Sequence, residues 1–187
     1  GVSGSKKDGI NHLQVVAEGG KYAQDDAQVL LVIIYSRENQ PERALELISR
    51  LSSRYPRNYL LGVERAVMLY RLGRHDEGAR VFNELLNNSD ITADATDVVS
   101  YQYGEALMET GKYGDAGLRY KAVMDWPKSE PDLVTLAHLR RGQALDALGR
   151  HDEARKEYQT VLKRDDAYNC HNLARKYNKK PYIPSAN

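Results

Sequence analysis

Two His-Asp-Glu triplets, beginning at His75 and His151, are the clearest candidates for chemistry in this sequence. Imidazole and carboxylate groups can hold zinc or iron, but the ligands must then converge at about 2 Å. The triplets occupy the same position in two copies of a repeated unit, and stacked helices are spaced about 10 Å apart, so they are not expected to share one ion. Acidic residues at a helix start are also favoured by the helix dipole. We therefore predict a structural role for both triplets, with no metal site and no cofactor.

The remaining chemical motifs are incomplete. Cys170 stands beside His171, but neighbouring helical residues point about 100° apart and no third group orients the pair. The pair Gly111-Lys112 is followed by Tyr113, where a phosphate-binding loop needs serine or threonine. The sequence contains no paired-cysteine, dinucleotide-binding or nucleophile-elbow motif. We predict no catalytic residues and therefore no enzyme.

The composition narrows the class of protein. The 187 residues include 27 Lys+Arg and 26 Asp+Glu, a net charge of +1, and 41% are hydrophobic. This balance is typical of an ordinary soluble domain, and it provides no excess of positive charge that would attract the phosphate backbone of a nucleic acid. The longest apolar run, residues 29–34, is far below the roughly 20 residues of a membrane span. The single cysteine favours the cytoplasm, although a bacterial periplasm stays open.

A short motif recurs along the chain at regular intervals. The octapeptide GRHDEGAR begins at Gly73, and GRHDEARK begins at Gly149. The related hexapeptide GKYGDA begins midway between them at Gly111, so the steps are 38 and 38 residues. A fourth version, NQPERA, begins at Asn39, which precedes Gly73 by 34 residues. The chain therefore contains four copies of one unit.

Each copy predicts a helix hairpin. An apolar helical stretch ends at the glycine or Asn39, and a charged segment then starts a second helical stretch. Three of the second stretches carry a small residue followed four residues later by a ring, which lets helix backbones approach closely. These pairs are Gly78 and Phe82, Ala116 and Tyr120, and Ala154 and Tyr158.

This pattern resembles the tetratricopeptide repeat (TPR) family over about residues 25–168. The family has a small residue at offset eight, counted from the first residue of each repeat, and this chain has Ala66, Gly104 and Gly142 there. The family's later alanine appears as Ala44, Ala116 and Ala154. Gly78 departs from that alanine, which is expected to loosen the second repeat. The first repeat and the junction RYPRNY at residues 54–59 also resemble, more loosely, bacterial relatives of a TPR family that includes a yeast mitochondrial inclusion-body clearance protein.

The resemblance implies an all-α fold, a right-handed superhelical solenoid of four helix hairpins with cap helices at both ends. The repeats are expected near 25–58, 59–92, 97–130 and 135–168. The first helices of the third and fourth repeats should begin about one turn early, near Asp94 and Pro131.

The two ends of the chain lie outside the repeats. Residues 1–9 are expected to be a disordered or vector-derived tail, and residues 10–178 a single solenoid with cap helices near 10–18 and 168–178. Residues 179–187 are expected to form a loose basic tail. Positions 171–187 carry four basic residues and no acid, so this end either keeps the cap solvated or attracts an acidic partner.

The TPR resemblance implies a concave groove lined by the first helix of each repeat. Its first half is expected to be apolar and its second half polar and acidic, and a protein or peptide segment should bind there. The family subclass that grips chaperone C-terminal carboxylates needs lysine and asparagine where this chain has Val29 and Ile33, so no such clamp is predicted. The expected groove residues are Val29, Ile33, Arg37, Val63, Val67, Tyr70, Arg71, Tyr101, Glu105, Met108, Leu139, Gln143 and Asp146.

The function that follows is a non-catalytic protein-interaction scaffold with a partner segment in its groove. The alternative is a structural spacer in a larger solenoid, or a self-association module that forms a homo-oligomer. The apolar strip in the first half of the groove is either covered by the chain itself or free for a partner. The identity of a partner does not follow from the fold.

Overall fold

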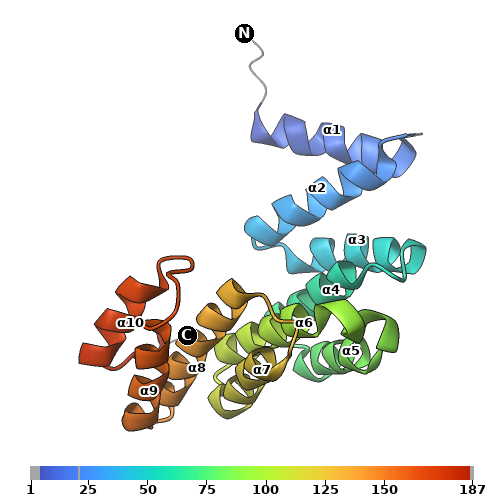
Figure 1. Ribbon diagram of the computed structural model, residues 1–187. Helices are drawn as coiled ribbons and strands as arrows, with labels where there is room; N and C mark the ends of the chain where they lie inside the picture. Colours follow the sequence, from blue (N-terminus) through green and yellow to red (C-terminus); the bar gives the residue numbers. More distant parts are fainter. Residues whose placement is uncertain (1–4, 21, 186–187) are drawn as a thin grey trace. The chain divides into compact units, whose positions relative to one another are not determined.

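The computed structural model describes residues 5–20 and 22–185. Within them the chain forms ten helices and no strand (Figure 1). The predicted all-α class, with four helix hairpins between two cap helices, is confirmed. Where the sequence predicts one solenoid over 10–178, the contacts group the chain into two compact units, Gly1–Leu85 and Leu86–Asn187.

The first unit consists of a cap helix and two hairpins. The helices are α1 (Lys6–Gly19), α2 (Gln24–Arg37), α3 (Pro41–Arg54), α4 (Tyr59–Arg71) and α5 (His75–Asn87). Helix α1 packs on α2, α2 on α3, and α3 on α4, and the Tyr70 ring of α4 packs on the Phe82 ring of α5. Helix α3 begins with Pro41 in its first turn, as the sequence predicts.

The second unit repeats the arrangement and ends in a cap helix. Consecutive helices pack together, and contacts also join α6 to α8 and α8 to α10. Contacts between alternate helices place the first helices of successive hairpins side by side, which is how hairpin repeats build one continuous face. The helices are α6 (Ser89–Glu109), α7 (Tyr113–Asp125), α8 (Pro131–Ala147), α9 (His151–Val161) and α10 (Cys170–Lys179).

Four hairpin turns use the same backbone conformation. Gly73, Gly111 and Gly149 have φ of 72°, 73° and 75°, and Asn39 has φ of 53°. This left-handed region is costly for residues with a Cβ, except that asparagine tolerates it better than most. The repeated motif was therefore a reliable signal of where each hairpin turns.

The N-terminal expectation needs correction. Helix α1 begins at Lys6, so the part of the expected 1–9 tail from Ser5 onward is structured, and residues 1–4 lie outside the described part of the chain. The Ser5 side chain accepts a hydrogen bond from the Asp8 backbone N–H, and the Asp8 carboxylate accepts one from the Ser5 backbone N–H. This capping box satisfies two N–H groups at the helix start.

The boundaries of the later elements differ in part. Helix α8 begins at Pro131 as predicted, but α6 begins at Ser89, ahead of the expected start near Asp94. The Asn88 side chain accepts a hydrogen bond from the backbone N–H of Asp90 and so caps this longer helix.

The C-terminal tail is not loose over its described part. After α10 ends at Lys179, the Tyr182 ring meets the Tyr177 ring edge to face, with centroids 5.3 Å apart. The Tyr182 backbone N–H donates to the Asp146 carboxylate at 2.8 Å. Tyr182 therefore anchors the segment 180–185 to the second unit, and residues 186–187 lie outside the described part of the chain.

Buried rings against small residues hold the hairpins together. The rings of Phe82, Tyr120 and Tyr158 are fully buried. A Cβ added to Gly104 would lie 2.6 Å from the Tyr120 ring, and one added to Gly142 would lie 2.5 Å from the Tyr158 ring. The small residues at offset eight therefore make room for the rings of the second helices.

The expectation of loose packing at Gly78 is wrong. The ring of Tyr70 fills the space there, since a Cβ on Gly78 would lie 2.5 Å from that ring. Tyr70 also packs against the Phe82 ring at a centroid distance of 6.1 Å. In the second repeat a ring of the first helix, Tyr70, therefore fills the space beside Gly78, and Phe82 keeps the ring position of the second helix.

Candidate functional site

An open apolar groove lies in the first unit between the first helices of two hairpins. Its volume is about 470 Å³. Val29, Ile33 and Leu60 are 43%, 44% and 52% exposed, although large aliphatic side chains are usually buried. Aliphatic side chains predominate along it, and it is lined by Val29, Val32, Ile33, Ser36 and Arg37 of α2, Leu51 of α3, Asn58 before α4, and Leu60, Leu61, Glu64 and Arg71 of α4.

Charged groups border this apolar surface. Arg37 and Arg71 are both exposed and belong to the last turns of α2 and α4. The Arg71 guanidinium donates to the backbone carbonyl of Ser36 at 3.4 Å, which links the two helix ends. Glu64 is the one acidic side chain that lines the groove within the described residues. The groove therefore offers an apolar strip that ends at two guanidinium groups.

The second unit has a polar site on α6 and α8. The Glu105 carboxylate accepts from the Tyr120 hydroxyl at 2.6 Å and from the Arg140 guanidinium at 2.5 Å. Burial, followed by the charge of Glu105, raises the pKa of Tyr101 to about 12. Burial disfavours the charge of Arg140, yet Glu105 raises its pKa above the ordinary value. Glu105 and Arg140 therefore form a hydrogen-bonded ion pair that also holds the Tyr120 hydroxyl.

Asp146 is a second centre of polar contacts in this unit. Its side chain is almost fully buried, and one carboxylate oxygen accepts from the Tyr158 hydroxyl at 2.7 Å. The same oxygen accepts the Tyr182 N–H, while the other oxygen lies 3.0 Å from Nδ1 of His151. Burial, followed by the hydrogen bond to Asp146, raises the pKa of Tyr158. Asp146 therefore joins α8, α9 and the C-terminal segment.

Only part of the predicted groove is available to a ligand. Val29, Ile33, Arg37 and Arg71 line the groove of the first unit, and Glu105 and Met108 line a smaller cavity in the second. Val67 is partly buried against the core of the first unit. The other predicted positions are buried because neighbouring helices cover them: Val63, Tyr70, Tyr101, Leu139, Gln143 and Asp146.

Both His-Asp-Glu triplets are at helix starts. The ring of His75 begins α5 and stacks on Tyr70 at a centroid distance of 5.3 Å. His151 begins α9 and meets Asp146, while Glu153 pairs with Arg150. These contacts support the structural interpretation. In the described part of the chain no three His, Cys, Asp or Glu side chains are grouped to hold a metal ion.

Cys170 and His171 do not form a nucleophile and base. The thiol is fully buried, and burial followed by the charge of Asp166 raises its pKa to about 11. The His171 ring instead meets the backbone carbonyl of Arg164 at 2.9 Å.

The Cys170 thiol is expected to be unreactive in the folded protein. A pKa of about 11, against an ordinary value of 9.0, leaves roughly a hundredth of the usual thiolate at pH 8. Reaction with Ellman's reagent should therefore be at least about a hundredfold slower in the native state than in 8 M urea. Equal rates in both conditions would contradict the buried placement.

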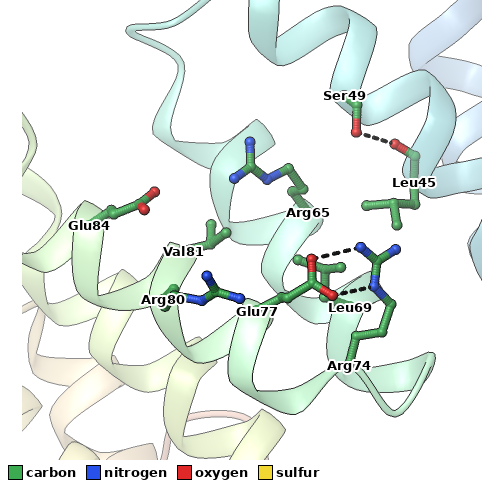
Figure 2. A pocket seen from close by; sticks show the side chains of 9 residues that line it. All are labelled: Leu45, Ser49, Arg65, Leu69, Arg74, Glu77, Arg80, Val81 and Glu84. Carbon is green, nitrogen blue, oxygen red and sulfur yellow. Dashed lines mark hydrogen bonds and ion pairs between the residues drawn. The ribbon is translucent and has the colours of Figure 1, made fainter.

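A third hollow lies on α3, α4 and α5 (Figure 2). Its volume is about 350 Å³, and Arg74 and Glu77 form a two-bonded ion pair at its edge, each bond 2.7 Å long. This contact lowers the pKa of Glu77. Arg65 and Arg80 also line the hollow, together with Glu84. Its charges are mixed and partly paired, so it has no clear preference for a ligand.

The sequence reading missed Leu60, Arg140 and the C-terminal pair Tyr182 and Pro184, which line the two grooves. The run PYIP that begins at Pro181 was the available signal, because an apolar aromatic segment between basic and polar residues is unusual for a solvated tail.

Comparisons with known proteins agree with this architecture. Two tetratricopeptide repeat models match the chain, one over residues 29–97 and one over residues 135–168. A solved structure titled MamA AMB-1 is similar, with 18% sequence identity and a TM-score of 0.55, and the match covers 84% of this chain and 95% of that chain. No curated protein matches, so the looser resemblance to a mitochondrial family has no support.

The hairpins, their turns and the first helices that lie side by side within each unit define a helical-repeat protein of the kind that binds other proteins. The chain belongs to the tetratricopeptide repeat family. Its general role is therefore that of a scaffold that binds protein partners. None of the helices in the described ranges is both long and apolar enough to cross a membrane.

Proposed function

We propose that this chain is a non-catalytic scaffold that binds an amphipathic helical segment of another protein in the groove of its first unit. The observation that supports the proposal most strongly is the exposure of Val29, Ile33 and Leu60 along one hollow. Soluble proteins seldom expose such a strip unless it binds something.

The chemistry of the groove defines the segment. An apolar helix face can lie on the aliphatic strip through residues at i, i+3, i+4 and i+7. Arg37 and Arg71 at the helix ends favour a carboxylate at the corresponding end of the segment. The expected ligand is therefore a short helix with one apolar face and an acidic residue at one end.

Peptides that fit this description can be selected from a displayed random library against the full chain and then measured by calorimetry. Ile33→Asp should weaken their binding at least about tenfold, because a carboxylate would be buried against apolar side chains. Leu30→Asp is the matched control, since Leu30 is 49% exposed on the same helix and does not line the groove. Both variants should keep the unfolding temperature of the parent.

Three outcomes would contradict the proposal. These are binding that survives Ile33→Asp, binding that is lost equally with Leu30→Asp, and a library that yields no binder. A dimer in light scattering that Ile33→Asp converts to a monomer would instead assign the groove to self-association.

A further inference from the structure

The C-terminal segment lies across the face of the second unit where the sequence predicts a binding groove. Tyr182, Pro184 and Ser185 line a cavity of about 190 Å³ together with Glu105, Met108, Glu109, Tyr113 and Arg140. Two of these, Glu105 and Met108, are among the expected groove residues, and Asp146, which is another, accepts the Tyr182 N–H. The chain thus places its own segment where a ligand was expected.

The contacts of this segment are those of a bound peptide. The Tyr182 N–H donates to a carboxylate that is itself 5% exposed, so the bond lies at the base of the groove and not on the surface. The Tyr182 ring packs on Tyr177, whose ring lies 5.9 Å from that of Tyr158. Ile183, between the two contact residues, is 75% exposed. Backbone and alternate side chains are therefore used in turn, as in recognition of extended peptides.

The sequence of the segment explains its extended shape. Pro181 and Pro184 fix φ and lack an N–H group, so residues 181–185 form neither helix nor strand. A proline-restricted segment loses little conformational entropy when it binds. The parts of the segment that meet the groove are the backbone N–H and ring of Tyr182 and, two residues later, Pro184, which lines the cavity.

We infer that the face of α6 and α8 is a second peptide-binding site, for extended Tyr-x-Pro segments of partner proteins, which Pro181–Ser185 occupies within the chain and thereby blocks. The segment is joined directly to α10, so its effective concentration at the groove is on the order of 1 mM. A partner segment must therefore compete with the chain's own segment at that effective concentration. This site is separate from the groove of the first unit and does not depend on it.

The test uses the full chain, labelled with ¹⁵N, and a synthetic peptide with the sequence KPYIPSAN of residues 180–187. Tyr182→Ala removes the ring contact and should release the segment. The peptide should then shift the amide signals of Glu105, Met108, Tyr113 and Asp146. Its apparent Kd should be at least about tenfold lower than for the parent chain, in which the segment competes. Ile183→Ala is the matched control and should behave like the parent.

The inference is overturned if folded Tyr182→Ala shows no shifts with 1 mM peptide, or if a peptide with alanine in place of its tyrosine binds equally well. Hydrogen exchange of the parent chain gives an independent measurement that needs no variant. The Tyr182 amide should exchange through local opening, much faster than the amide of buried Leu139 in α8. Equal protection of the two amides would show that the segment is a fixed part of the fold, and would also overturn the inference.

Discussion

Replacing Gly142 by alanine is expected to lower the free energy of unfolding by about 2 kcal/mol, within the range of overpacked cores. The new Cβ would lie 2.5 Å from Cε1 of Tyr158, whose ring is fully buried. The ring has little room to move because its hydroxyl is hydrogen-bonded to Asp146. For a chain of this size the loss corresponds to a fall in melting temperature of about 4–8 °C.

Gly117→Ala is the matched control for this prediction. Gly117 lies inside α7, and a Cβ there would meet nothing within 4 Å. Alanine is the better helix former, so this variant should gain about 0.5–1 kcal/mol. The cost at Gly142 should also shrink when Tyr158→Leu has removed the ring, as a double-mutant cycle in urea can measure. Equal effects of the two alanines would show that the glycine at offset eight is not a packing position.

The hairpins could be predicted because their signals are local. Each turn glycine needs a left-handed conformation, and the repeated spacing around Gly73, Gly111 and Gly149 marks the turns without knowledge of any neighbour. The starts at Pro41 and Pro131 are equally local, since proline fits the first turn of a helix.

The accessible part of the groove could not be predicted in the same way. The position of a residue in the repeat determines which face of its own helix it lies on. Its exposure depends, in addition, on the size of the side chains that the neighbouring helices place against that face. Tyr101 faces the Tyr120 ring at a centroid distance of 5.7 Å and is buried, whereas Val29 at the same offset of the first repeat is 43% exposed. The same limit explains Gly78, where the departure from the family pattern is filled by a ring from the other helix.

The placement of the C-terminal segment was the hardest feature to predict from the local sequence. Its contact between Tyr182 and Asp146 spans 36 residues and has no periodic pattern. The two prolines exclude a helix, but they do not indicate whether the segment is solvated or bound. Its basic neighbours suggested a solvated tail, and the packing of Tyr182 on Tyr177 corrects that interpretation.

Removing one partner of the ion pair between Glu105 and Arg140 is expected to cost more than removing both. Glu105→Leu leaves the guanidinium without its carboxylate and the Tyr120 hydroxyl without its acceptor. A fully buried charge left alone costs about 3–5 kcal/mol. The Arg140 side chain is 35% exposed, so water recovers part of that, and we expect a loss of about 2 kcal/mol.

The double variant Glu105→Leu with Arg140→Met should regain about 1 kcal/mol of this loss, because apolar side chains of similar size leave no unpaired charge. An exposed pair provides the control: Glu46, whose side chain is 66% exposed, pairs with Arg50 in α3, and Glu46→Leu should change stability by less than about 0.5 kcal/mol. Urea unfolding at pH 7 measures all of these variants. If Glu105→Leu is as mild as Glu46→Leu, the polar site on α6 and α8 contributes nothing to the fold. If the double variant is no more stable than the single one, the unpaired Arg140 guanidinium is not what makes Glu105→Leu costly, and the expectation is wrong.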